Sequence, residues 1–179
     1  MREACEAAIA PGDLYEATLQ VFLFAGYPRA INAFDLLAAT LGEGGGGPPR
    51  EEHPPDLLAR GDALFRRVYG ADAERVLEKL RRLHPEFCLY VLRDAYGQVL
   101  GRPFLPLIER ELMAVAMLGA LRLPSQLRAH ARGALRVGAA PEEVRGALES
   151  LRDVVGEEAA RAAADIVARE LPGGGTLAP

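Results

Sequence analysis

The sequence predicts an all-α protein. Apolar residues recur at helical spacing over long stretches, as at Leu14, Ala17, Val21 and Phe24. Proline and glycine stand where such stretches begin and end, which is typical of helix boundaries. No segment of useful length alternates apolar and polar residues as a half-buried strand would. Half of the 179 residues are hydrophobic, which is enough for a packed core.

The N-terminal region is predicted to be a helical hairpin followed by a linker. A short helix is expected over residues 2–9. Two longer helices are expected from about Asp13 to Ala25 and from Pro28 to Leu41, separated by Gly26. Glycine and proline runs then exclude helix over much of the next segment. We therefore expect a hairpin domain over residues 1–42 and a flexible linker over 43–57, in which His53 is solvated.

A larger helical domain is predicted over residues 58–171. Its expected helices cover residues 60–69, 72–83, 85–100, the hairpin within 105–138, and two segments after Pro141 that Gly156 separates. Residues 172–179 are expected to form a frayed tail.

Two parts of the chain are similar in register. Pro11–Phe34 aligns without a gap on Pro141–Ala164, so that Pro11 meets Pro141 and Gly26 meets Gly156. Two interpretations stay open: a partial internal repeat of common origin, or chance similarity between two helical hairpins. In either case the N-terminal copy is too short to include a counterpart of His130.

Composition excludes several classes of protein. The formal net charge of −4 argues against general binding of nucleic acid. The longest strongly apolar run, Leu112 to Leu121, is about half the length of a membrane helix, and the first residues do not resemble a signal peptide. Cys5 and Cys88 lie far apart and suit a reducing compartment. We expect a soluble cytoplasmic protein that binds neither membranes nor nucleic acid.

Glu111 and His130 are the candidate catalytic residues. Glu111 lies in an almost wholly apolar helix, where a carboxylate needs a partner or takes up a proton. His130 lies on the apolar face of the next helix, and imidazole is the side chain generally suited to proton transfer near neutral pH. Together they are suited to general acid–base catalysis. The alternatives are that Glu111 pairs with an arginine such as Arg128 and that His130 is an ordinary core residue.

Arginines recur every four residues on another face of the same helix, at Arg128, Arg132 and Arg136. Arg128 and Arg132 are the candidates for holding an anionic substrate; the alternative is a solvated stripe paired with nearby acids. No cluster of His, Cys and acidic residues has metal-ligand spacing, and no glycine-rich phosphate loop follows a strand. We therefore expect no metal and no cofactor.

The positions of Glu111 and His130 along their helices limit how the two side chains can meet. Glu111 lies roughly 18 Å of helix before Leu123, and His130 lies roughly 10 Å after it. In a parallel-sided hairpin the two side chains would not be level. They can meet only if the helices cross obliquely, through a water molecule, or across a subunit boundary.

About residues 60–170 resemble the carboxymuconolactone decarboxylase family, which includes the alkylhydroperoxidase D proteins. The resemblance rests on the runs YGQVLGRPFLPLIERELMAVAMLGAL and QLRAHARGALRVGAAPEEVRGAL. The family pattern is an acid, then C-x-x-C about a dozen residues later, then a histidine four beyond the second cysteine. Glu111 and His130 stand at the acid and histidine positions, whereas Leu123 and Gln126 stand at the cysteine positions.

The resemblance implies a multihelical bundle with a two-helix arm that self-associates as a trimer, hexamer or dimer. Without the cysteine pair, thiol peroxidase and disulfide reductase activities are disfavoured. The decarboxylase branch, a group of lyases, also lacks the pair. It implies proton transfer by Glu111 and His130 during decarboxylation of a small carboxylated acid or lactone. The alternative is a catalytically inactive module for oligomerisation or small-molecule binding.

Overall fold

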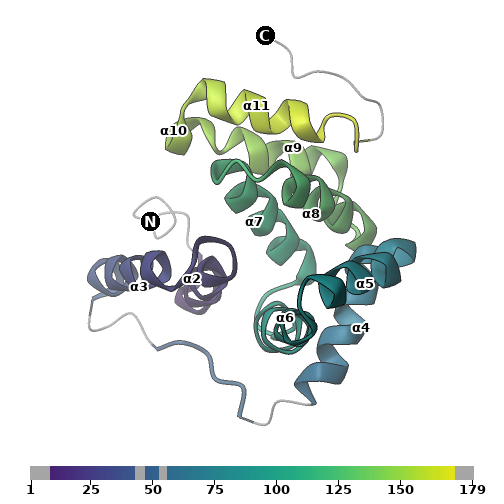
Figure 1. Cartoon of the computed structure of the whole chain (residues 1–179). Helices are drawn as coiled ribbons and strands as arrows, with labels where there is room; N and C mark the ends of the chain where they lie inside the picture. The colour runs from purple at the N-terminus through teal and green to yellow at the C-terminus, as the bar shows by residue number, and fades with distance from the viewer. Residues whose placement is uncertain (1–8, 43–46, 53–55, 172–179) are drawn as a thin grey trace.

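The described residues of the computed structural model are 9–42, 47–52 and 56–171, and they contain helices but no strand (Figure 1). The all-α prediction is confirmed. Cys5, His53, the tail over 172–179 and nearly all of the helix predicted over 2–9 lie outside the described residues. None of the described helices combines the length and apolar character that crossing a lipid bilayer requires.

The N-terminal hairpin consists of α2 (Pro11–Ala25) and α3 (Tyr27–Leu41). Gly26 joins them with φ 82° and ψ 164°, a conformation that residues with a side chain rarely adopt. In Figure 1 the hairpin lies to one side of the larger helical body.

The first layer of the larger body is built on α4 (Leu57–Tyr69) and the segment that crosses it. A short 3₁₀ turn, η1 (Gly70–Asp72), leads into α5 (Ala73–Leu83) and α6 (Pro85–Tyr90). The last of these continues without a break as a π-helix, η2 (Val91–Leu100). The backbones of α4 and η2 approach each other closely: a Cβ on Gly97 would lie 2.0 Å from the Leu57 carbonyl oxygen, and one on Gly61 would lie 1.8 Å from that of Leu92.

The second layer contains α7 (Leu107–Ala120), α8 (Pro124–Val137), α9 (Pro141–Glu149), α10 (Arg152–Val155) and α11 (Glu157–Val167). These helices stack side by side in the green-to-yellow half of Figure 1. Their shared core is formed mainly by alanine, valine and leucine side chains, among them Ala114, Val115, Leu118, Leu127, Val144, Leu148 and Val167. A second cluster, which includes Phe65, Leu77, Leu92 and Tyr96, fills the first layer.

The most deeply buried residues of α2 are polar. They are Glu16, Thr18 and Gln20, whereas the apolar residues at helical spacing, Leu14, Ala17, Val21 and Phe24, are only half-buried. The reason is Arg110 of α7, which is fully buried and requires an opposite charge. Glu16 accepts a hydrogen bond from Arg110 at 2.7 Å and pairs with Arg102 at 2.8 Å, while the Gln20 amide donates to the Arg110 carbonyl at 2.7 Å.

The two segments of the predicted repeat share one backbone feature. Gly156, between α10 and α11, has φ 85° and ψ 161°, nearly the geometry of Gly26 between α2 and α3. This agreement is compatible with either origin, since the same turn arises wherever two helices meet at this angle. The internal repeat therefore stays a prediction.

Candidate active site

Glu111 of α7 and His130 of α8 form a direct hydrogen bond, with Nδ1 of the imidazole 2.9 Å from Oε2 of the carboxylate. Glu111 is fully buried and His130 is 7% exposed. The pairing of Glu111 with Arg128, considered above, is not observed. The two side chains meet directly within one chain, so their contact needs neither a bridging water molecule nor a subunit boundary.

The hydrogen bond determines which imidazole nitrogen is free. An ionised carboxylate only accepts hydrogen bonds, so we assign the proton of a neutral imidazole to Nδ1. No hydrogen bond to Nε2 occurs within the described part of the chain, and Oε1 of Glu111 is buried there without a partner. Glu111 thus orients the ring and fixes its tautomer, which leaves Nε2 free to exchange a proton with a ligand.

Two neighbours hold this pair in place. Gly133 lies one turn beyond His130, and a Cβ there would be 2.7 Å from both Glu111 Oε2 and Val68 Cγ1. The absence of a side chain at Gly133 therefore makes room for the carboxylate. Phe24 of the N-terminal hairpin meets the imidazole edge-on, with ring centroids 5.4 Å apart.

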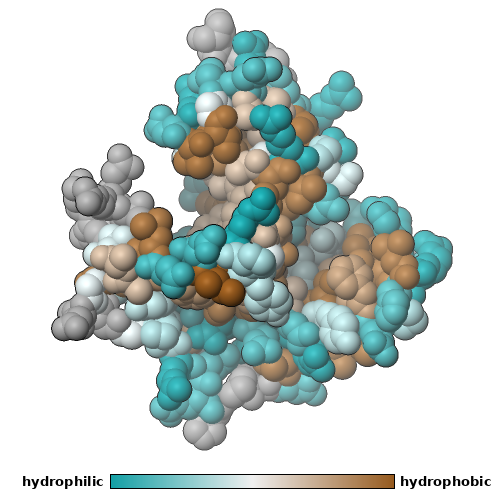
Figure 2. Space-filling view, turned by 60° about the vertical axis from the view of Figure 1, so that its left-hand side comes forward, coloured by the Kyte–Doolittle hydropathy of each residue, from teal (hydrophilic) through white to brown (hydrophobic). Residues whose placement is uncertain are grey.

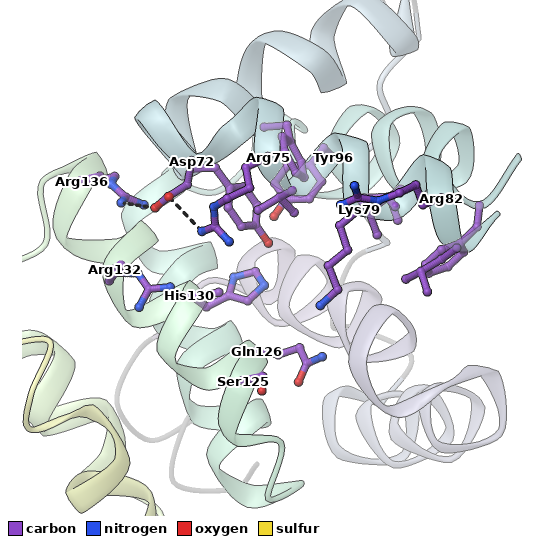
Figure 3. Close-up of a pocket in the computed structure, with 18 residues that line it drawn as sticks. Asp72, Arg75, Lys79, Arg82, Tyr96, Ser125, Gln126, His130, Arg132 and Arg136 are labelled. Carbon is purple, nitrogen blue, oxygen red and sulfur yellow. Dashed lines mark hydrogen bonds and ion pairs between the residues drawn. The ribbon is translucent and has the colours of Figure 1, made fainter. Parts of the chain in front are cut away.

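His130 opens onto a cavity of about 670 Å³ between α5, α8 and the α6–η2 segment (Figure 3). This is within the usual range for small-molecule sites. Gln126, at the second cysteine position of the family pattern, lines the cavity. Leu123, at the first cysteine position, precedes α8 and is 39% exposed. Among the described residues no group of three His, Cys, Asp or Glu side chains converges as metal ligands would.

Two tyrosines in the cavity wall were not predicted to belong to the site. Tyr69 and Tyr96 both line the cavity. Burial, and then the nearby Glu111 charge, raise the pKa of Tyr69. Burial, followed by the Tyr69 and Glu111 side chains, holds the pKa of Tyr96 well above its ordinary value. Both hydroxyls therefore stay protonated at neutral pH. The Tyr96 hydroxyl is buried beside Tyr69, and the two side chains influence each other's pKa.

The two predicted substrate-binding arginines are separated by the structure. Arg132 lines the cavity with His130 and pairs with Glu170 at 3.1 Å. Arg128 instead lines a different pocket with Asp165 and Arg169. Residues four apart on a helix point in directions that differ by about 40°, and this offset, together with the position of α11, turns Arg128 away from the cavity.

Two further cations at the cavity, Lys79 and Arg82 of α5, were also missed. Neither forms an ion pair within the described residues, whereas Arg75 and Arg136 both pair with Asp72. Lys79 is the only lysine of the chain, but a sequence pattern gives no means of knowing that α5 would lie opposite α8.

Comparison with known proteins gives a family and two relatives to which this chain is similar. Residues 89–169 match the carboxymuconolactone decarboxylase family. The chain is 35% identical over 71 residues to a 4-carboxymuconolactone decarboxylase of Acinetobacter baylyi, covering 40% of this chain and 53% of that protein. It is 29% identical over 143 residues to Peroxisomal protein 2 of Schizosaccharomyces pombe, covering 75% of this chain and 64% of that protein.

The matches cover less than two thirds of the length of either relative. The family match begins at residue 89, within α6, so α4 and α5 precede it. It includes both Glu111 and His130, and positions 123 and 126 within it carry leucine and glutamine. The segment over residues 89–169 is therefore similar to the carboxymuconolactone decarboxylase family and lacks the cysteine pair.

Proposed function

We propose that this protein transfers a proton during decarboxylation of a small carboxylated or lactone substrate. The observation that carries the proposal is the buried hydrogen bond between Glu111 and His130 at the wall of a cavity lined with cations. An imidazole oriented by a carboxylate is a common general acid–base unit. The name of the Acinetobacter relative, a 4-carboxymuconolactone decarboxylase, supports the same class of reaction.

In the proposed step the carbon–carbon bond to the substrate carboxylate breaks and carbon dioxide leaves. The electron pair of that bond stays on the substrate carbon, which then takes a proton from Nε2 of protonated His130. Glu111 stabilises the imidazolium through Nδ1. Arg132 and the Tyr96 hydroxyl line the same cavity and are suited to holding substrate oxygens. Carbon dioxide, the protonated product and neutral His130 balance the step.

Thiol chemistry is not part of this proposal. Cys88 is a buried free thiol and lines a pocket on α4 and α6 rather than the cavity of His130. Replacement of Cys5 and Cys88 by serine should therefore leave the activity unchanged. Loss of activity in that double variant would support a thiol mechanism instead.

The test is carbon dioxide release from a panel of carboxylated lactones and related acids. His130→Ala should lower kcat/KM by at least about 100-fold, the usual contribution of a general acid, and Glu111→Gln should lower kcat with little change in KM. His84→Asn is the matched control: His84 is exposed outside the cavity and caps α6, a role that asparagine can keep. Equal rates of carbon dioxide release by wild type and His130→Ala would contradict the proposal.

A second candidate is a small-molecule-binding module without catalysis. Leu123 and Gln126 at the family's cysteine positions favour it, because neither side chain can act as a nucleophile or a redox group. Saturable binding of an acid that is never turned over, in wild type and in His130→Ala alike, would support this candidate.

The relative in S. pombe is named as a peroxisomal protein, so the cytoplasmic location predicted for this chain stays a prediction.

Self-association also stays a proposal. Large apolar side chains on α3 are exposed, with Tyr27 at 70%, Ile31 at 59% and Leu36 at 56%. Figure 2 shows hydrophobic residues interrupting the hydrophilic surface on the side of the molecule that is turned forward there. Such residues are commonly covered in oligomers.

A further inference from the structure

We propose that the cavity is built for an elongated acid with an apolar body, whose far end carries an anionic group held by Lys79 and Arg82. This inference rests on the proposed function for the near end, where a carboxylate reacts at His130. It adds a substrate class, because a small lactone would not reach from His130 to the outer part of α5.

The distribution of charge defines the anionic end. Arg75 and Arg136 share Asp72, at 2.9 and 3.1 Å, and Arg132 is paired with Glu170. Each of these three arginines therefore has an acidic partner, although Arg75 and Arg136 share one carboxylate. Lys79 and Arg82 are without an ion pair among the described residues, although both line the cavity. An uncompensated pair of cations at a cavity rim is a site for an anion.

An apolar surface lies beside these cations. Leu80, Leu83, Phe87 and Val91 line the same cavity from α5, α6 and η2. Leu83 is 66% exposed and Phe87 is 48% exposed, which leaves apolar area uncovered at the cavity mouth. A ligand with an aliphatic or aromatic body would remove this area from water, at about 25 cal/mol for each Å².

The dimensions fit an elongated molecule. The cavity volume of about 670 Å³ equals that of roughly twenty water molecules in the liquid, more than a small lactone occupies. Figure 3 shows Lys79 and Arg82 on one side of His130 and Arg132 and Arg136 on the other. Arg75 and Arg82 are separated by roughly 10 Å along α5, so the cations extend along the cavity rather than meeting at one point.

The residues that select the far end also lie outside the family match. Helix α5 ends at Leu83, before the match begins at residue 89. Glu111 and His130 thus lie within the part of the chain that is similar to the family. The cations proposed to hold the anionic group, and half of the apolar residues beside them, come from α5, which precedes that part. This separation is expected if the chemistry is shared and the substrate body differs.

Calorimetric binding to the full chain tests this inference independently of turnover. The probes are octanedioate, with a carboxylate at each end of an aliphatic chain, octanoate, which lacks the second carboxylate, and succinate, which lacks the apolar body. We expect octanedioate to bind at least about tenfold more tightly than either. Lys79→Gln and Arg82→Gln should each weaken octanedioate binding about tenfold and bring it close to octanoate, and Phe87→Ala should bring it toward succinate.

Arg81→Gln is the matched control. Arg81 adjoins Arg82 on the same helix but pairs with exposed Glu74 and is absent from this cavity, so its loss should leave binding unchanged. Equal affinities for succinate and octanedioate, or equal effects of Arg81→Gln and Arg82→Gln, would overturn the inference. So would concentration-dependent dimerisation that Leu83→Ser abolishes, because a second copy would then cover the apolar surface. Binding of octanedioate without carbon dioxide release from any acid would keep this inference and contradict the proposed function.

Discussion

Gly133 shows how one residue without a side chain permits the hydrogen bond between Glu111 and His130. A helix tolerates glycine at a cost of about 1 kcal/mol relative to alanine. Here the missing Cβ leaves the volume that Glu111 Oε2 occupies, 2.7 Å from where that atom would lie. The contact between α7 and α8 is thus close enough for the carboxylate to reach His130.

Gly133→Ala should displace the Glu111 carboxylate and destabilise the fold by about 1–3 kcal/mol, as overpacking does. Urea unfolding and the NMR resonances of the His130 ring measure the two effects. Gly146→Ala in α9 is the control, because a Cβ there has no neighbour within 4 Å; it should stabilise by about 0.5–1 kcal/mol. Unchanged His130 resonances in Gly133→Ala would contradict the role given to this glycine.

At the scale of single residues, the sequence was sufficient to predict some residues of the candidate site but not others. Glu111 and His130 could be predicted because an acid and a histidine on apolar helix faces are unusual and their spacing matches a family pattern. Tyr96, Lys79 and Gly133 could not be, since helical periodicity shows which residues share one face but not which other helix that face meets. For the same reason Arg128 was predicted together with Arg132, and only Arg132 lies at the cavity.

A buried ion pair between Glu16 and Arg110 holds α2 against α7. Glu16 is 2% exposed and lies between Arg110 and Arg102. Burial lowers the pKa of Arg110, and Glu16 opposes that effect. Two of its guanidinium nitrogens, Nε and Nη1, are buried without partners in the described structure. Arg110 therefore depends strongly on Glu16.

Glu16→Gln should lower the free energy of unfolding by about 3–5 kcal/mol, because it leaves the buried Arg110 charge uncompensated. Asp62→Asn, which breaks an exposed pair with Arg66, should change it by less than about 1 kcal/mol. Denaturant unfolding measures both. A double replacement, Glu16→Leu with Arg110→Met, should regain much of the loss; a double variant as unstable as the sum of its single changes would refute buried charge as the cause.

The segment predicted as one helix over residues 85–100 is an α-helix, α6, followed by the π-helix η2. Leu92, Tyr96 and Val99 are buried, whereas Phe87 is 48% exposed. In a π-helix hydrogen bonds span five residues rather than four, so the set of residues on one face differs from that of an α-helix. A prediction from the spacing of apolar residues assumes a regular α-helix, so it cannot show where the backbone changes to a π-helix.

At the scale of the whole molecule, local rules were sufficient for the fold class. Proline and glycine fixed most helix boundaries to within a few residues, because their backbone effects do not depend on distant parts of the chain. The packing of α2 through polar residues, and the cavity between α5 and α8, depend on contacts between segments far apart in the sequence. These were beyond the reach of patterns read along one segment.

Global stability should fall at alkaline pH because of Tyr96. Its pKa is raised in the folded state, while in the unfolded chain it titrates near 10. The unfolded state therefore loses the proton first, so the free energy of unfolding is unaffected below pH 10 and decreases as the pH rises above it. Denaturant unfolding from pH 8 to 11 should show a shallower decrease for Tyr96→Phe, whereas the exposed-residue control Tyr90→Phe should follow wild type. Parallel curves for wild type and Tyr96→Phe would contradict this assignment.

The crossing of α4 and η2 at Gly61 and Gly97 has an evolutionary consequence. With backbone against backbone, neither helix can shift to accommodate a larger side chain, and Tyr96 is anchored immediately beside this point. Substitutions that diversify ligand choice are then expected to accumulate on α5, whose exposed cations and Leu83 can change without disturbing that crossing. The same Glu111–His130 pair can in this way be kept in descendants that differ in the molecules they accept.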